Sequence, residues 1–415
     1  MQALSLALRR RMPQSRIMTK AAVFCLAAGM ASAQTVSLTV NTGTVLQTID
    51  SRIYGQSLEH IYHSVNGGLR PDLTEAVAAL HPPILRWPGG SFVGKYKWKD
   101  GIGPRSKRVD PLSFGIDEFL AFARKVGAEP VVVIPVGPRN QVDQAAMIRD
   151  AVDLVAYCNG PPDSAWGKIR AQNGHPEPYR VKYWEIDNEI SGMPAADYIE
   201  VLGQFAPAMR KVDPNIRIIG QGDLADYLSV HDDERSKNPK RKLFVSGWNA
   251  QSGDWRGGLH AGTILNALER DAAVAMASPS SDNALINFDQ RSWFPSPNYV
   301  VMKLYRDHFA PELLAIAGSL GDLSATATRT ADGDKIYLKL VNPGDQAVAV
   351  EVALRGDFPL LAASMQLVAQ DSLAARNTLE QPTAVQAVPA KVERTGMTAR
   401  FRLPRWSVAV VTLSR

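Results

Sequence analysis

Cysteine is scarce in this sequence, and its scarcity limits how the fold is stabilised. The 415 residues include two cysteines, Cys25 and Cys158. Cys25 lies in the N-terminal leader described below, so Cys158 has no internal disulfide partner and stability must come from a hydrophobic core. Cys158 follows the apolar spacing of Ile148, Val152 and Val155 on a predicted helix. This spacing favours a buried structural thiol over a nucleophile.

An excess of charge of one sign is also absent from most of the chain. The formal net charge is +5, from 46 basic and 41 acidic residues. Five of the bases and none of the acids lie in residues 1–33, so residues 34–415 carry 41 of each. A neutral body excludes a general electrostatic attraction to nucleic acid or to an anionic membrane. With 45% hydrophobic and 21% charged residues, the composition is that of a globular protein.

The first 33 residues have the order of an export signal. Basic residues as far as Lys20 precede an apolar run over 21–30, and Ala31-Ser32-Ala33 supplies a cleavage site before Gln34. The run has about half the length that a bilayer crossing needs. We therefore expect a signal peptide over 1–33 and a periplasmic or extracellular protein with no membrane attachment after cleavage. A start at Met18 and an N-terminal helix of the fold are the alternatives.

Short apolar segments alternate with amphipathic helices as far as about residue 290, which is the pattern of a parallel sheet with crossover helices. The run Val131–Ile134 is continuously apolar, as in a strand buried on both faces. One of the expected helices covers Gly262–Met276. Eight strands are expected, at Ile53–Gln56, Ile84–Trp87, Pro130–Val136, Val181–Ile186, Ile216–Gly220, Tyr227–Val230, Leu243–Ser246 and Ala284–Phe288. This pattern predicts an α/β fold, a (β/α)₈ TIM barrel over residues 53–315.

Residues 316–415 have a different pattern, with short strands and turns in place of helices. Ile336–Leu340, Val348–Val352 and Phe401–Leu403 alternate or are continuously apolar, and Asn342-Pro343-Gly344-Asp345 is typical of a turn. We expect an antiparallel β-sandwich here. The alternation of Val36–Val40 predicts that residues 34–52 contribute a strand to the same sandwich.

Polar and aromatic side chains follow several of the predicted barrel strands. In a TIM barrel these positions share one face, where active sites lie. A carboxylic acid there can protonate a leaving oxygen, and an amide can bind a hydroxyl group. Each residue also has a structural alternative, such as a core tryptophan or a helix-capping acid. The candidates are Glu59, Trp87, Asn188, Glu189, His231 and Trp248.

Several motifs resemble the α-L-arabinofuranosidases of glycoside hydrolase family fifty-one. They are Ile53–His60, Leu85–Gly90, Trp98–Arg105, Trp184–Glu189, Phe244–Asn249 and Ala284–His308. The resemblance implies a (β/α)₈ barrel with a β-sandwich and a retaining mechanism. It implies that Glu189 is the acid/base, with Asn188 beside it, and that Glu59 contacts substrate hydroxyl groups. His231 matches a histidine at the end of the sixth strand.

The nucleophile of the family does not match. The family pattern is Ser-Glu-Trp-Asn, whereas this chain has Ser246-Gly247-Trp248-Asn249. A retaining glycosidase needs a second carboxylate about 5–5.5 Å from the first. Glycine has no side chain that could attack the sugar. The resemblance therefore implies that Gly247 occupies a vacated nucleophile position, with the acids at 232–234 as distant substitutes.

Two connections are too short or too polar for the family's barrel. A parallel crossover needs roughly a dozen residues, yet four separate Gly222 from Tyr227, and the segment 232–242 has no apolar stripe. We expect a barrel that is incomplete around its fifth to seventh strands.

The resemblance implies an exported hydrolase that removes terminal α-L-arabinofuranosyl groups from arabinoxylan or arabinan. The alternative is a catalytically impaired remnant that binds sugar without efficient turnover, and a different glycosidase activity, for example on xylosides, is a weaker third. The expected partner is an arabinofuranosyl-containing oligo- or polysaccharide, with no nucleic acid and no membrane, and a homo-oligomer is left open. No metal cluster, phosphate loop or nucleotide fingerprint indicates a cofactor.

Overall fold

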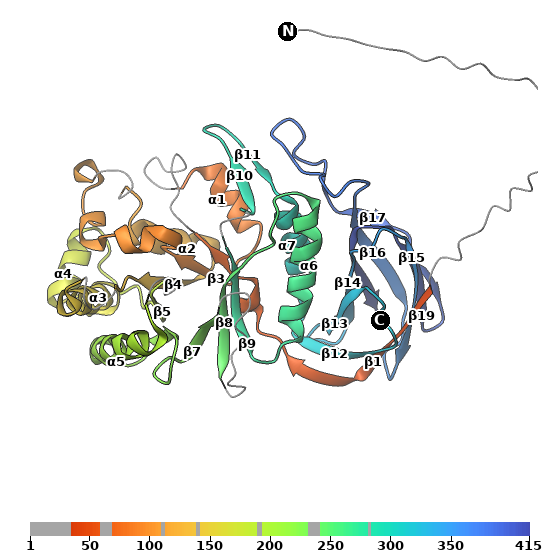
Figure 1. Ribbon diagram of the computed structural model, residues 1–415, viewed down its shortest axis with the longest axis horizontal. Coiled ribbons are helices and arrows are strands. Elements are labelled where there is room, and N and C mark those ends of the chain that lie inside the picture. The colour runs from red at the N-terminus through yellow and green to blue at the C-terminus, as the bar shows by residue number, and fades with distance from the viewer. Residues whose placement is uncertain are drawn as a thin grey trace, which may run out of the picture. The chain divides into compact units, whose positions relative to one another are not determined.

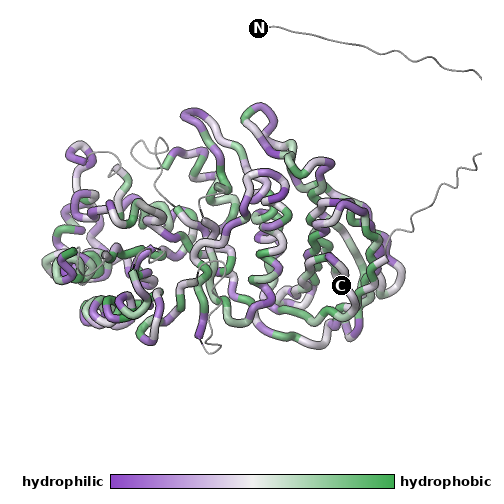
Figure 2. Tube along the Cα trace, viewed as in Figure 1, coloured by the Kyte–Doolittle hydropathy of each residue, from purple (hydrophilic) through white to green (hydrophobic). Residues whose placement is uncertain are grey.

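Two large β-sheets and one two-stranded sheet, with helices packed around and between the large ones, make up the computed structural model (Figure 1). The structure describes residues 35–58, 69–108, 113–137, 142–188, 193–230, 241–280 and 284–415. Hydrophobic residues gather along the strands of both sheets (Figure 2). Within the described residues, no helix has the length and apolarity that crossing a membrane would require.

The first sheet is a parallel, nearly closed barrel, which confirms the predicted fold class. Its eight strands lie in sequence order, and each is parallel to the next. Ser57 Oγ on the first strand donates to Ser278 Oγ on the last at 3.1 Å, which brings the two edges together. The strands are β2 Gln56–Ser57, β3 Ile84–Trp87, β4 Glu129–Ile134, β5 Tyr183–Ile186, β6 Arg217–Gly220, β7 Tyr227–Val230, β8 Lys242–Trp248 and β9 Val274–Pro279.

Apolar side chains from the barrel strands fill the interior of this barrel. Ile84, Val131, Ile219 and Phe244 are fully buried together, with Tyr183 and Met276 in the same cluster. On the opposite side of the strands, alternate residues pack against the helices. The barrel is therefore a packed core with its polar groups confined to its two ends.

Two of the predicted barrel strands are wrong. The eighth strand is β9 and not Ala284–Phe288, because Ile286–Phe288 (β10) pairs with Trp293–Pro295 (β11) in a separate two-stranded sheet. The apolar run from Val274 continues the helical pattern before it, and alanine and methionine are good helix formers, so the sequence favoured a helix there. The first predicted strand is largely a 3₁₀ turn, η1 Ser51–Tyr54.

Helices cover the outside of the barrel in the connections from β2 to β6 and between β8 and β9. The six residues 221–226 between β6 and β7 carry no helix, and these two strands overlap by two residue pairs. Asp226 closes this link, since its amide donates to Ile218 O at 2.7 Å and its carboxylate accepts from Ile218 N at 2.8 Å. The helices are α1 Pro71–Ala78, α2 Ile116–Val126, α3 Gln144–Asn159, α4 Ala165–Gln172, α5 Ala195–Val212, α6 Trp255–Arg270 and α7 Pro297–Asp307.

Cys158 lies on α3 and is fully buried, as its apolar spacing predicts. Burial raises the pKa of its thiol well above the ordinary value. A thiol in this state is inert, because the thiolate is the reactive form.

The second sheet has ten strands in the order β17-β16-β20-β14-β13-β12-β1-β15-β19-β18. Strand β1 (Thr35–Thr48) is antiparallel to β12 and parallel to β15, so the predicted C-terminal β-domain is present but its pairing is mixed and not wholly antiparallel. Side chains from both halves of the sheet share one core. The other strands are β12 Glu312–Ala317, β13 Ser324–Arg329, β14 Lys335–Asn342, β15 Val348–Arg355, β16 Ala362–Ala369, β17 Val388–Ala390, β18 Glu393–Thr395, β19 Thr398–Leu403 and β20 Ser407–Ser414. After the barrel, the chain enters the second sheet with β12 at Glu312.

A buried ion pair joins the two parts of the fold. Glu269, near the end of α6, pairs with Lys339 on β14, and both side chains are completely buried. The Glu269 carboxylate also accepts hydrogen bonds from Tyr54 Oη at 2.5 Å and Thr326 Oγ1 at 2.7 Å. Burial lowers the pKa of Lys339, opposed by the attraction of Glu269. Removing one partner of such a pair leaves an uncompensated buried charge, so the pair specifies how the two parts dock.

Candidate active site

The C-terminal ends of the barrel strands hold a buried ion pair. Arg86 on β3 donates through Nε to Glu185 Oε2 on β5 at 2.6 Å, and the side chains are 2% and 1% exposed. Both residues occupy inward-facing positions, because Arg86 follows the interior residue Ile84 by two and Glu185 follows Tyr183 by two. A charge in this place is tolerated only when it is paired.

The same arginine fixes the side chain of Asn188. Arg86 Nη2 donates to Asn188 Oδ1 at 2.9 Å, and the backbone amide of Gly90 donates to the same oxygen at 3.2 Å. With its oxygen held toward β3, the amide directs its NH₂ group the other way. Asp187, just before it, has a φ of 72°, a left-handed conformation at which the chain turns out of β5. Asn188 is therefore presented as a hydrogen-bond donor at the mouth of the barrel.

Two serines extend this network to the far side of the barrel. Ser229 on β7 donates to Glu185 Oε1 at 3.2 Å, and Ser229 Oγ lies 3.0 Å from Ser246 Oγ on β8. Both serines are buried. The network therefore links β3, β5, β7 and β8.

Gly247 lies beside Ser246, in an irregular part of β8. Between Val245 and Trp248 the register with β9 shifts, so that three steps along β8 match two along β9. Such a bulge breaks the strict alternation of a strand and re-aims the residues within it, and bulges are common beside active sites. The position after Ser246 is half-buried at the end of the strand.

The two tryptophans predicted to bind substrate lie in the core. Trp87 is 2% exposed, and its ring stacks on Phe119 of α2 at 5.1 Å between centroids and meets Tyr96 edge-on at 4.7 Å. Trp248 is 1% exposed and belongs to the apolar cluster between the barrel and α6. Its indole nitrogen has no hydrogen-bond partner among the described residues. These surroundings give Trp87 a packing role.

Three of the predicted site residues, Glu59, Glu189 and His231, lie outside the described residues, as do the acids at 232–234. The structure brings Asn188 and Gly247 to one edge of the barrel and places Trp87 behind it. It adds four residues to which the sequence assigned no role: Arg86, Glu185, Ser229 and Ser246. A signal for Glu185 was present, because a carboxylate interrupts an otherwise apolar strand at an inward-facing position.

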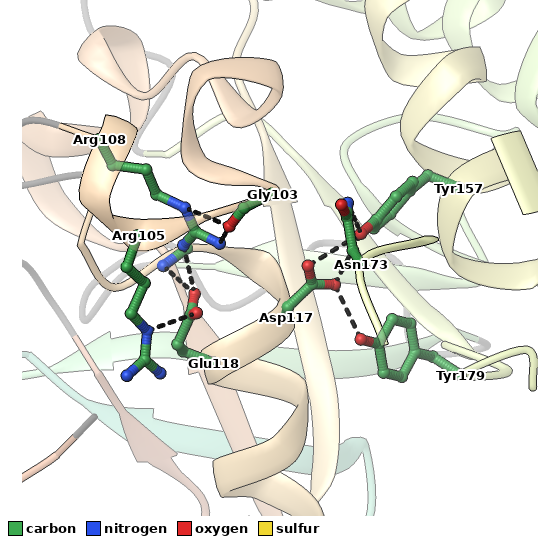
Figure 3. A network of polar contacts seen from close by, with 9 residues as sticks. Gly103, Arg105, Arg108, Asp117, Glu118, Tyr157, Asn173 and Tyr179 are labelled. Carbon is green, nitrogen blue, oxygen red and sulfur yellow. Dashed lines mark hydrogen bonds and ion pairs between the residues drawn. The ribbon is translucent and has the colours of Figure 1, made fainter. Parts of the chain in front are cut away.

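The long segment between β3 and α2 borders this mouth and is anchored by a second polar network (Figure 3). Glu118 on α2 accepts from Arg108 Nη1 at 2.8 Å and from Arg105 Nε at 3.1 Å, while Arg108 also donates to Gly103 O. The backbone N–H of Gly115 donates a hydrogen bond to the same carboxylate at 2.8 Å. Burial by itself would raise the pKa of Glu118, but these hydrogen bonds lower it below the ordinary value.

The neighbouring Asp117 points to the opposite side of α2 and holds α3 and the segment before β5 (Figure 3). Tyr157 Oη and Tyr179 Oη donate to its carboxylate, each with a contact of 2.8 Å. Burial raises the pKa of Asp117 and outweighs these hydrogen bonds. Glu118 thus fastens the segment that follows β3 to α2, and Asp117 fastens α3 and the segment before β5 to the same helix.

Among the described residues, no three histidine, cysteine, aspartate or glutamate side chains gather as metal ligands do. The described part of the site therefore consists of an ion pair, an oriented amide and hydroxyl groups. These groups suit a neutral ligand rich in hydroxyl groups, because each donates or accepts hydrogen bonds without a strong net charge.

Known sequences resemble this chain over most of its length. The family model described as "Alpha-L-arabinofuranosidase 1 domain" matches residues 76–246, and that described as "Alpha-L-arabinofuranosidase C-terminal domain" matches residues 230–407. An extracellular exo-α-L-arabinofuranosidase of Streptomyces chartreusis is 28% identical over 66% of this chain and 44% of its own. An intracellular exo-α-(1→5)-L-arabinofuranosidase of Acetivibrio thermocellus is 32% identical over 47% of each chain. This chain thus spans less than half the length of these relatives.

Solved structures resemble the fold. The α-L-arabinofuranosidase of Thermotoga maritima, solved as an arabinose complex, superposes with a TM-score of 0.82 at 23% identity, covering 92% of this chain and 100% of the other. The family fifty-one enzyme of Thermotoga petrophila gives a TM-score of 0.81 at 24% identity, covering 91% and 100%. At these identities the likeness concerns the fold.

We expect Glu118→Gln to lower the free energy of unfolding by about 1–3 kcal/mol at pH 7, because a buried, charge-assisted hydrogen-bond set is lost. The folded pKa of Glu118 lies below the unfolded one, so this contribution is complete above the unfolded pKa and is lost as the pH falls through the folded pKa. Denaturant titrations at a series of pH values measure the free energy of unfolding of the wild type and of Glu118→Gln. The difference between the two should shrink as the pH falls from 7 to 3. Glu129→Gln, at an exposed position, is the control; a difference that persists at low pH would contradict the assignment.

Proposed function

This chain belongs to the α-L-arabinofuranosidases of glycoside hydrolase family fifty-one, and we propose that its barrel mouth binds a terminal α-L-arabinofuranosyl group of arabinoxylan or arabinan. The observation that carries the proposal is the orientation of Asn188. Its oxygen is engaged by Arg86 and Gly90, so its NH₂ group faces away from these two residues and is the part of the side chain that would donate to a sugar hydroxyl at the mouth. An oriented donor of this kind provides specificity, because a ligand without the hydroxyl would leave it unpaired.

The family's reaction assigns two further roles. Glu189, directly after Asn188 in the chain, would protonate the leaving oxygen as general acid and later activate water. The nucleophile position falls on Gly247, in the bulge of β8, and supplies no carboxylate. Glu185 is not a substitute, because it is 1% exposed and committed to Arg86 and Ser229. Loss of a nucleophile costs on the order of a million-fold where catalytic residues act as a unit.

We therefore propose that the chain binds arabinofuranosides and turns them over very slowly. The second candidate, a sugar-binding protein without useful turnover, differs only in degree and is favoured by the same Gly247 and by the helix-free link between β6 and β7. Both proposals place the ligand at the same barrel mouth. The experiment that distinguishes them asks whether hydrolysis can be restored there by supplying a nucleophile.

We also propose export, which is supported by the order of basic run, apolar run and Ala31-Ser32-Ala33 in the leader. We expect the exported protein to begin near Gln34. N-terminal sequencing of protein secreted by a bacterial host measures this directly. Exported protein that retained Arg9–Arg16 would contradict the proposal.

The strongest test of the proposed reaction restores the missing group. On an aryl arabinofuranoside, which needs little protonation of its leaving group, we expect very slow hydrolysis by the wild type. Azide should accelerate it and give a glycosyl azide of inverted configuration, because a small anion can attack from the space at Gly247. Gly247→Glu should accelerate it through the retaining route.

Gly247→Gln is the matched control, since it fills the same space without a nucleophilic carboxylate and should remain slow. Product configuration is followed by nuclear magnetic resonance. Wild-type turnover at about 1–1000 per second would contradict the assignment of Gly247 and would make Asp232, Asp233 and Glu234 the first residues to mutate. Absence of rescue by both azide and glutamate would favour the sugar-binding alternative.

A further inference from the structure

Helix α6 connects β8 to β9 in the chain, and its first turn also donates hydrogen bonds to the domain of the second sheet, called the second domain below. The first N–H groups of a helix have no partner within the helix. Here Trp255 N donates to Ala375 O at 2.8 Å and Arg256 N donates to Leu373 O at 3.2 Å. Both carbonyl groups belong to the segment between β16 and β17 of the second sheet. The start of α6 is therefore held from outside the barrel.

The side chain of Trp255 adds a third bond of the same kind. It is fully buried, and its indole Nε1 donates to the backbone oxygen of Trp406 at 2.7 Å, just before β20. Three donors from two adjacent residues of the barrel thus bind three carbonyl groups of the second domain. The Asp254 side chain caps the helix locally, since it also accepts from Arg256 N at 3.1 Å, and the three bonds to the second domain add to this cap and tie the start of α6 to that domain.

The other end of α6 is fixed to the same domain. Glu269 is paired with the buried Lys339, and Arg270 Nη1 donates to Ala325 O at 2.6 Å. Gln47 Nε2 on β1 donates to Glu269 O at 3.0 Å. With both ends held, α6 cannot slide along its axis relative to the second sheet without breaking bonds to buried groups.

The short segment between β8 and α6 passes this constraint on to the mouth of the barrel. Ser252 O accepts from Asn298 Nδ2 at 3.1 Å, and a Cβ atom at Gly257 would lie 1.8 Å from Ser252 O, so the helix backbone presses directly on the segment. Ser280 N donates to Trp248 O at 2.9 Å at the end of β8. Contacts at Trp248 and Ser252 therefore restrict the conformation of residues 249–254.

We infer that the second domain positions the nucleophile side of the active site through α6, and that Trp255 is the positioning residue. The inference rests on the proposed function, in which Gly247 marks the nucleophile position. Residues 249–254, whose conformation is restricted, begin two residues after Gly247. The domain does not touch the substrate in this account. It sets where β8 ends, and a displacement of about 1 Å at reacting groups costs on the order of a hundredfold in rate.

The test compares Trp255→Phe with Trp166→Phe, each introduced into the Gly247→Glu protein. Both substitutions remove one indole hydrogen bond and keep an aromatic ring, and Trp166 donates to Asp153 at 2.9 Å on α3, away from the mouth. We expect Trp255→Phe to lower kcat on an aryl arabinofuranoside by about ten- to a hundredfold with little change in KM. Trp166→Phe should leave kcat nearly unchanged at a comparable melting temperature.

Hydrogen exchange over residues 246–254 gives a readout that needs no activity. Faster exchange there in Trp255→Phe alone supports the inference, even if Gly247→Glu proves inactive and the proposed function fails. Equal exchange in both variants, or equal losses in kcat, would overturn it. If Trp255→Phe does not fold, Asn377→Ala replaces it, because the Asn377 amide shapes the acceptor segment through Val385 N at 2.7 Å and Val385 O at 3.1 Å.

Discussion

The barrel mouth depends on one interaction, the buried ion pair of Arg86 and Glu185. Neither charge could remain in the barrel interior alone, so β3 and β5 must present them at matching heights across β4. Once the pair forms, the remaining Arg86 donor reaches Asn188 and the remaining Glu185 oxygen reaches Ser229. The orientation of the Asn188 amide follows from this arrangement.

A second constraint acts from outside the barrel. The helix after β8 is bonded at both ends to the mixed sheet, through Trp255 and through the Glu269–Lys339 pair. The two sides of the mouth are therefore fixed by different means, the β3–β5 side by an internal ion pair and the β8 side by the second domain.

The sequence predicted the barrel because alternation and continuous apolar runs report directly on burial, and Ile84–Trp87 and Tyr227–Val230 match the structure residue for residue. It failed at Val274–Pro279, where Ala and Met fit a helix and only pairing with β8 selects a strand. The parallel pairing of β1 with β15 has no local signal either. In the site, the motifs indicated Asn188, but its orientation depends on Arg86 and Gly90, a long-range contact that no sequence pattern encodes.

The central claim is that the Arg86–Glu185 pair turns the Asn188 amide toward an arabinofuranosyl group. A crystal structure of the protein with a bound arabinofuranosyl oligosaccharide tests it most directly. The account predicts the terminal sugar at the barrel mouth, with Asn188 Nδ2 donating to a ring hydroxyl at about 3 Å and Oδ1 still bonded to Arg86. A sugar bound elsewhere, or an Asn188 side chain that has left Arg86 to contact the ligand, would contradict it.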